Sequence, residues 1–279
     1  MKTYLDKNVY EAALERIAYC FQEFDNVLVS FSGGKDSGVM LNLCYRYAAE
    51  QGLLDKLSMY HLDYEAQYQM TTEYVTRTFL EQFPGIRKMW YCVPIRAQSA
   101  CSLGEPYWTP WSAAQKKLWV RSMPENPYVI NEKNLDVPFR HGMVDYEFQD
   151  KLSRHFAKKH GSTAVMVGLR ADESLNRYAA VARGNKRTSY EGRKWITRAD
   201  AVTVSAYPLY DWRVSDVWTA NARFGFDYNR LYDLLYQAGL TIGQMRVASP
   251  FNDCAQESLK LYKVIDPANW ARMVGRVNG

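Results

Sequence analysis

The protein has 279 residues, of which 47% are hydrophobic, 23% charged and 14% aromatic, a composition that excludes a disordered or collagen-like chain. No run approaches the roughly 20 apolar residues of a membrane helix, and charged side chains interrupt residues 1–20, where a signal peptide needs an apolar core, so we expect a cytoplasmic protein without membrane contact. The net charge is +5, and the segment from Arg170 to Arg198 accounts for all of it with eight basic and three acidic residues, which favours an anionic ligand.

Apolar runs and helical periodicities alternate along the chain. Helical periodicity is found at 8–24, 37–51, 64–83, 146–160 and 214–239. Five apolar runs have the length of buried strands, at 26–31, 57–62, 88–93, 164–167 and 201–206. The alternation predicts an α/β fold with a mainly parallel five-stranded sheet flanked by helices. Ligands of such sheets bind at the carboxyl ends of the strands, so the residues that follow each strand are the candidates for a site.

Residues 94–137 interrupt this alternation. The segment contains Trp108, Trp111 and Trp119 together with five prolines, and it shows no clean period. Because so aromatic a segment does not stay solvated, we expect an insertion that packs on the domain.

The cysteines indicate which sites to exclude. They are an odd number and widely spaced, with no C-x-x-C pair: Cys20, Cys44, Cys92, Cys101 and Cys254. This spacing predicts neither a disulfide framework nor an iron–sulfur cluster.

The first strand runs directly into Ser32-Gly33-Gly34-Lys35-Asp36-Ser37, and a helix follows. Two glycines allow a sharp turn and a close approach of backbone to ligand, and the free N–H groups of the helix start attract an anion. The spacing differs from that of a Walker A loop. The structural alternative is a glycine turn with a serine N-cap.

The strand–SGGKDS–helix pattern resembles the PP-loop of the ATP-pyrophosphatase (adenine nucleotide α-hydrolase) superfamily. Further segments are similar to motifs of its PAPS (phosphoadenosine phosphosulfate) reductase-like family: Tyr60-His61-Leu62-Asp63, Gly168-Leu169-Arg170-Ala171-Asp172-Glu173-Ser174 with Arg177, and Tyr207-Pro208-Leu209-Tyr210-Asp211-Trp212 with Ser215-Asp216-Val217-Trp218. They occur in the family's order over most of the chain. The resemblance implies a nucleotide-binding domain at 1–240 and a helical C-terminal extension at 241–279 packed on it.

The resemblance also implies roles for single residues. Lys35, Asp36 and Arg170 would be catalytic, and Mg²⁺ would be held by Asp36 and Asp63. The adenine nucleotide, ATP or a PAPS-like molecule, would be bound by Ser32, Gly33, Gly34, Lys35, Asp36, Ser37, Asp63, Gly168, Arg170 and Arg177. Structural alternatives remain open, because Asp63 could be an exposed turn residue and Arg170 an ion-pair partner of Asp172 or Glu173.

Two other segments resemble a divergent branch of the family, typified by immunoglobulin-binding regulator A and often encoded beside a ParB-like partner. The first runs from Asn229-Arg230-Leu231-Tyr232-Asp233 to Ala238-Gly239-Leu240 and on to Gln244-Met245-Arg246-Val247, and the second consists of Trp108, Trp111 and Trp119-Val120-Arg121. The branch implies a ParB-like protein partner, and we expect a homo-oligomer. The basic segment at 183–198 could contact nucleic acid or form a mobile flap over the nucleotide.

We expect an enzyme that acts at the phosphate or phosphosulfate group of an adenine nucleotide. The resemblance implies that a PAPS reductase of the assimilatory type needs a thiolate near the C-terminus in an E-C-G-[IL]-H-like motif, and neither glycine nor histidine directly follows Cys254. Chemistry on ATP is therefore favoured over self-contained reduction of a sulfonucleotide. The alternatives are a PAPS reductase that uses an external thiol, and a regulatory or defence component that works with a ParB-like protein or nucleic acid.

Overall fold

A central β-sheet organises the chain in the computed structural model, which describes residues 6–102, 104–182, 189–247 and 249–277. Its strand order is β6-β3-β2-β1-β7-β10-β9-β8. The five strands predicted from sequence form its parallel centre: β1 (Asn26–Ser30), β2 (Leu57–Leu62), β3 (Arg87–Tyr91), β7 (Thr163–Val167) and β10 (Thr203–Ala206). The α/β class and the mainly parallel sheet are thereby confirmed.

The prediction of five strands was too low, because three further strands extend the sheet at its edges. β6 (Val129–Ile130) pairs parallel with β3, whereas β9 (Arg193–Arg198) and β8 (Ser189–Tyr190) form an antiparallel extension beyond β10. β6 and β8 are too short to give a periodic signal. β9 contains several charged residues and one buried residue, Ile196, so it lacks the apolar pattern of a buried strand. Residues 193–198 are therefore a sheet strand and not a mobile flap, while 183–188 lie outside the described residues.

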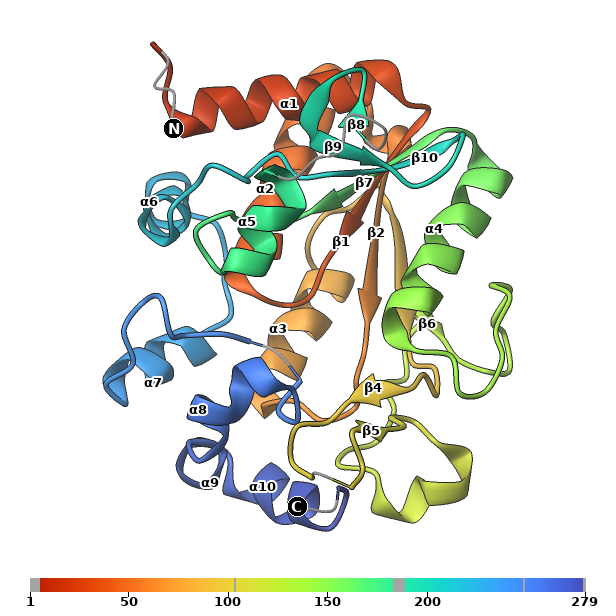
Figure 1. Ribbon diagram of the computed structural model, residues 1–279, viewed down its shortest axis with the longest axis vertical. Helices are drawn as coiled ribbons and strands as arrows, with labels where there is room; N and C mark the ends of the chain where they lie inside the picture. The colour runs from red at the N-terminus through yellow and green to blue at the C-terminus, as the bar shows by residue number, and fades with distance from the viewer. Residues whose placement is uncertain (1–5, 103, 183–188, 248, 278–279) are drawn as a thin grey trace.

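Helices cover both faces of the sheet (Figure 1). On one face α1 (Val9–Glu23), α2 (Lys35–Gln51), α3 (Gln69–Leu80) and α6 (Val214–Phe224) pack on alternate strand residues such as Val27 and Val29. On the opposite face α4 (Asp145–His160) packs on Leu28 and its neighbours. Within the described residues no helix is long and apolar enough to cross a membrane.

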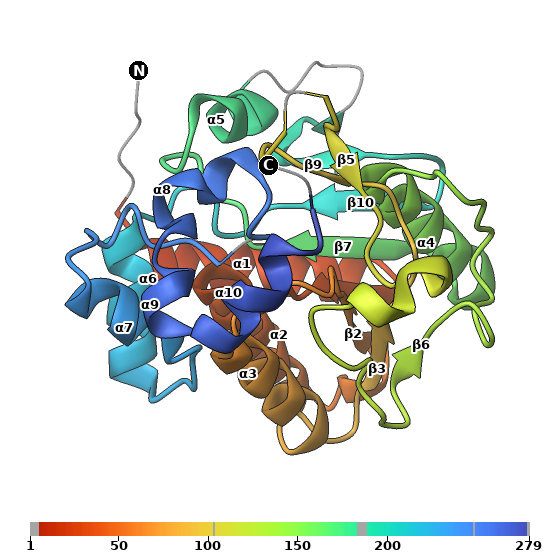
Figure 2. The same cartoon turned by 90° about the horizontal axis from the view of Figure 1, so that it is seen from below.

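A third apolar cluster lies beyond the carboxyl ends of the strands and joins segments that are distant in sequence. It combines the insertion, which contains β4 (Ala97–Gln98), β5 (Tyr107–Trp108) and a 3₁₀ helix (Ala113–Leu118), with the C-terminal third of the chain. Besides α6, which packs on the sheet, the α-helices of that third are α7 (Leu231–Gln237), α8 (Gln256–Leu259), α9 (Tyr262–Ile265) and α10 (Pro267–Val274). Figure 2 shows α8 and α10 in front of the sheet, seen from below. Because this edge is where an α/β sheet binds its ligand, the C-terminal segment and the insertion enclose the candidate site.

Candidate functional site

The loop between β1 and α2 is held by its own hydrogen bonds. The hydroxyl of Ser37 accepts the Ser32 backbone N–H at 3.1 Å and donates to the Gly34 carbonyl at 3.1 Å, and the two serine Oγ atoms lie 3.0 Å apart. Gly33 has φ +78°, and a Cβ there would lie 3.0 Å from Val75 Cγ2, so the turn favours glycine for conformation and for space. The predicted loop residues therefore form a tight turn at the start of α2.

A second loop, which follows β7, touches the first one backbone to backbone. A Cβ on Gly168 would lie 2.8 Å from the carbonyl carbon of Asp36 and 2.9 Å from the nitrogen of Ser37. No real Cβ atom makes contacts this short, so only glycine allows the approach. This contact places Arg170 beside the start of α2.

Asp36 lies between two buried cations. Arg170 donates through Nε to one carboxylate oxygen of Asp36, and Lys35 Nζ lies 3.3 Å from the other. A second nitrogen of Arg170 donates to Asp172, which is the structural alternative left open from sequence. Arg170 and Lys35 are 3% and 5% exposed, so both charges are largely withdrawn from water at a helix N-terminus, where an anion is favoured.

The C-terminal segment covers Lys35. The Lys35 backbone N–H donates to the Tyr232 hydroxyl at 3.1 Å, and Nζ donates to the Met245 carbonyl at 3.3 Å and lies 5.3 Å from the centre of the Tyr232 ring. Burial, and secondarily the charge of Asp36, raises the pKa of Tyr232, so this hydroxyl stays neutral. Tyr232 and Met245 were not predicted as site residues, although the segments that contain them carried the resemblance to the divergent branch.

Arg177 lies at the outer side of the same cluster. It forms an ion pair with Glu173 at 2.8 Å, and Arg246 donates to the Glu173 carbonyl at 2.9 Å. Arg246, which sequence analysis did not propose as a site residue, thus fastens the C-terminal segment to the loop after β7. A nucleotide role for Arg177 stays a prediction.

Asp63 lies at the end of β2, fully buried and already paired. Arg121 donates to both of its carboxylate oxygens at 2.6 and 2.5 Å, the Trp90 indole N–H donates at 2.8 Å, and the Glu65 backbone N–H donates at 2.8 Å. Burial by itself raises the pKa of Asp63, but the charge of Arg121, the His61 ring and the hydrogen bonds from Arg121 and Glu65 together outweigh it and hold this pKa below its ordinary value. Asp63 is therefore not the exposed turn residue of the structural alternative.

The two carboxylates predicted to hold Mg²⁺ do not fit an open cation site. Asp63 is saturated by donors, and Asp36 lies between Lys35 and Arg170. No group of three or more metal-ligating side chains occurs in the described part of the chain. The magnesium site stays a prediction that this geometry does not favour.

Glu65 ties the C-terminal segment to the insertion. Its carboxylate accepts the backbone N–H groups of Trp111 and Val120 at 2.7 and 3.0 Å. Arg276 donates to the same carboxylate through Nε at 2.7 Å and through Nη2 at 3.0 Å, and the side chains of this ion pair are 0% and 1% exposed. The pair holds the C-terminal cover in place, and the sequence alone gave no indication of it.

A small cavity of about 80 Å³ adjoins the loop. Two of its polar atoms, His61 Nε2 and Ser249 Oγ, are buried and have no hydrogen-bond partner among the described residues. The other ring nitrogen of His61 binds the Phe31 carbonyl at 2.8 Å, and burial lowers the pKa of this imidazole, so it is neutral. The cavity is lined by Ser32, His61, Leu62, Tyr64, Ala66, Gln67, Val247 and Ser249.

Comparison with known proteins identifies the family. The model of the phosphoadenosine phosphosulfate reductase domain matches residues 26–250, which is most of the chain. The chain belongs to this family. A second family model, a domain of unknown function (DUF3440), matches residues 239–279 and overlaps the end of the first match. The resemblance stated from the motifs is thus confirmed for the family, whereas the branch and the division at residue 240 stay predictions.

The chain is also similar to one curated protein in sequence and to solved structures in fold. The uncharacterized protein YbdN of Escherichia coli is 36% identical over 278 residues, which cover 99% of this chain and 66% of YbdN, so the chain spans about two thirds of that relative. A PAPS reductase from Candida auris, in a phosphate complex, is 14% identical with a TM-score of 0.47, covering 89% of this chain and 97% of the other. The tRNA thiolase NcsA from Methanococcus maripaludis, solved with its [4Fe-4S] cluster, is 12% identical with a TM-score of 0.45, covering 99% and 80%.

Proposed function

We propose that this PAPS reductase-like chain is an enzyme that binds an adenine nucleotide at the 32–37 loop and acts at its phosphate or phosphosulfate group. The observation that carries the proposal is the pair of buried cations, Lys35 and Arg170, held on Asp36 at the start of α2. Buried cations at a helix N-terminus favour oxyanions, and they would stabilise charge that develops during group transfer.

The nucleotide would enter by displacing the C-terminal cover. A cavity of about 80 Å³ is far below the roughly 300 Å³ at which ligand pockets begin, so Val247 and Ser249, which line it, have to move for a nucleotide to bind. A phosphate oxygen would then replace the Tyr232 hydroxyl on the Lys35 N–H. Hydrogen bonds to charged groups contribute about 1.5–3 kcal/mol, more than the roughly 1 kcal/mol of a neutral one, so the exchange is favourable. His61 Nε2 and Ser249 Oγ would supply hydrogen bonds to the nucleoside.

The cysteines favour ATP over a sulfonucleotide. Reduction of a phosphosulfate needs a thiolate, and burial raises the pKa of Cys20, Cys44, Cys92 and Cys101 above the ordinary thiol value. Cys254 was the remaining candidate, and its side chain lies outside the described part of the structure. With ATP, an acceptor oxygen or nitrogen would form a bond to the α-phosphorus as the bond to the bridging oxygen breaks, and pyrophosphate would leave with the bond electrons.

Product analysis with each nucleotide tests the proposal. Incubation with ATP is expected to release AMP or an adenylated product together with pyrophosphate, whereas PAPS with dithiothreitol should release no sulfite. Replacement of Lys35 with Ala should lower the rate about 10²-fold, since removal of one donor to a developing charge typically has that effect. Lys151→Ala is the matched control, because Lys151 lies on α4 in a surface ion pair with Glu147. Sulfite release with an added thiol would favour the reductase alternative, and full activity of Lys35→Ala would refute the site.

A further inference from the structure

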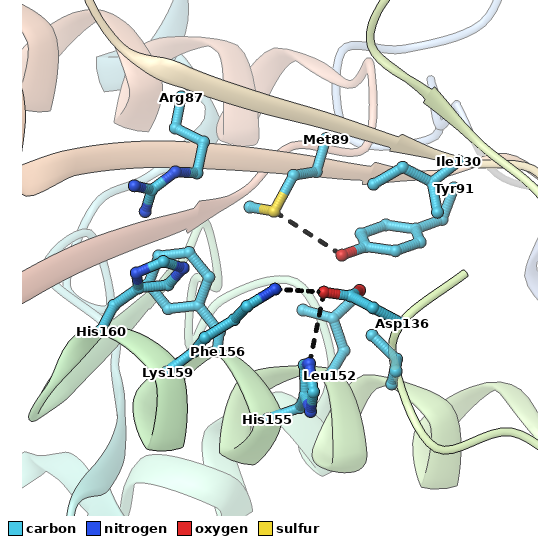
Figure 3. A pocket seen from close by; sticks show the side chains of 11 residues that line it. Arg87, Met89, Tyr91, Ile130, Asp136, Leu152, His155, Phe156, Lys159 and His160 are labelled. Carbon is cyan, nitrogen blue, oxygen red and sulfur yellow. Dashed lines mark hydrogen bonds and ion pairs between the residues drawn. The ribbon is translucent and has the colours of Figure 1, made fainter. Parts of the chain in front are cut away.

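A second cavity, of about 280 Å³, lies between β3, α4 and the segment that follows β6 (Figure 3). None of its lining residues belongs to the 32–37 loop or pairs with it. β3 provides one wall with Met89 and Tyr91, and α4 provides the opposite wall with Leu152 and Phe156. The volume is slightly below the usual range of ligand pockets, so it suits a small molecule with an apolar body.

Positive charge is unbalanced at one end of this cavity. Arg87 is exposed, its guanidinium lies 5.6 Å from the centre of the Phe156 ring, and among the described residues no carboxylate pairs with it. The His160 ring packs against the same Phe156 ring, with the two ring centres 4.6 Å apart. Burial lowers the pKa of His160, and the charges of Arg87 and Lys159 lower it further. An anion would balance this end.

The opposite end of the cavity is already neutralised. Asp136 accepts from Lys159 at 2.6 Å and lies 3.4 Å from His155 Nε2 (Figure 3). The negative end of the α4 dipole accounts for basic residues in its last turn, such as Lys159 and His160. It does not account for Arg87, which comes from β3.

A buried hydroxyl in the β3 wall also lacks a strong acceptor. Tyr91 is 3% exposed, and the contact that its hydroxyl makes within the described residues is with the thioether sulfur of Met89, at 3.6 Å. Thioether sulfur is a weak acceptor, so an oxygen of a bound ligand would be a better partner.

We propose that this cavity binds a small organic carboxylate. The carboxylate pairs with Arg87, the apolar body lies between the β3 wall and the side chains of Leu152 and Phe156, and the Tyr91 hydroxyl donates to a ligand oxygen. This site is separate from the proposed nucleotide site and does not depend on it.

Titration followed by ¹H–¹⁵N NMR tests the site with benzoate, 4-hydroxybenzoate and hexanoate as probes, and benzamide as the neutral match of benzoate. At millimolar concentration at least one carboxylate should shift the Arg87 Nε signal and the amide signals of Tyr91 and Phe156 saturably, and benzamide should bind at least about 10-fold more weakly than benzoate.

Variants separate the pocket from general surface binding. Arg87→Gln should weaken the bound carboxylate about 10-fold, and Arg154→Gln, which changes an exposed arginine of α4 outside the cavity, should leave the affinity unchanged. Ile130→Trp fills the cavity from β6 and should abolish carboxylate binding. This result counts only if the amide spectrum away from β6 and α4 is retained, which shows that the variant is folded. If that spectrum changes, the affinity of Arg87→Gln is the test of the site. Equal binding of benzamide and benzoate, insensitivity to Arg87→Gln, shifts confined to residues 32–37, or no saturable shift with any of the three carboxylates would each overturn the proposal.

Discussion

Removal of the Tyr232 hydroxyl tests whether the C-terminal segment competes with the nucleotide. In Tyr232→Phe the Lys35 N–H loses its acceptor at 3.1 Å, while the aromatic ring near Lys35 Nζ is retained. A buried donor without a partner costs about 1–3 kcal/mol, so the free energy of unfolding should fall by that amount. For a chain of this size, we expect Tm to fall by about 2–4 °C per kcal/mol.

The same substitution should strengthen nucleotide binding. The free variant lacks the hydrogen bond that a nucleotide has to break, and the bound variant lacks nothing, because a phosphate oxygen would satisfy the Lys35 N–H. A gain of about 1 kcal/mol corresponds to about 5-fold tighter binding of ATP. The variant should therefore be less stable alone and bind more tightly.

Differential scanning fluorimetry and isothermal titration calorimetry measure the two effects separately. Tyr236→Phe is the matched control, since Tyr236 lies on the same helix and is 64% exposed, and it should change neither value. Weaker binding of ATP to Tyr232→Phe would refute the reasoning, because it would mean that the hydroxyl binds the nucleotide instead of competing with it. Unchanged affinity with a lower Tm would show that Tyr232 stays on Lys35 when the nucleotide is bound.

Three further substitutions examine other parts of the site. Gly168→Ala should destabilise the fold by about 1–3 kcal/mol in a urea titration and weaken nucleotide binding, because its Cβ would lie 2.8 Å from the loop backbone. Gly243→Ala is the control: it has open space around it and should leave the free energy of unfolding unchanged. Arg276→Ala should lower the free energy of unfolding by about 3–5 kcal/mol, because Glu65 would be left as a buried unpaired charge; a loss below 1 kcal/mol in urea would contradict this. Because the pKa of Asp63 is held below its ordinary value of 3.8, its contribution to stability is complete above that pH and is lost as pH falls through the lower folded value. Asp63→Asn should therefore lower stability at neutral pH and flatten the acid limb of the stability curve, and an unchanged limb would count against the pairing.

Local patterns in the sequence predicted the centre of the fold. The five parallel strands are buried on both faces, so they appear as short apolar runs that need no tertiary information to be recognised. Short or charged edge strands lack such a signal, and β9 was therefore missed. The region at 64–68 was predicted as helix, but α3 begins only at Gln69, because Glu65 has φ +67° and turns inward to its buried partners.

The sequence by itself determined the family, the 32–37 loop and its place between a strand and a helix, because these depend on residues adjacent in the chain. Only the tertiary structure decided which partners these residues have. Tyr232 and Met245 reach Lys35 from 197 and 210 positions away, and Arg121 reaches Asp63 from 58. Such contacts depend on how the insertion and the C-terminal segment pack over the strand ends, and no periodicity or spacing within either segment predicts that packing.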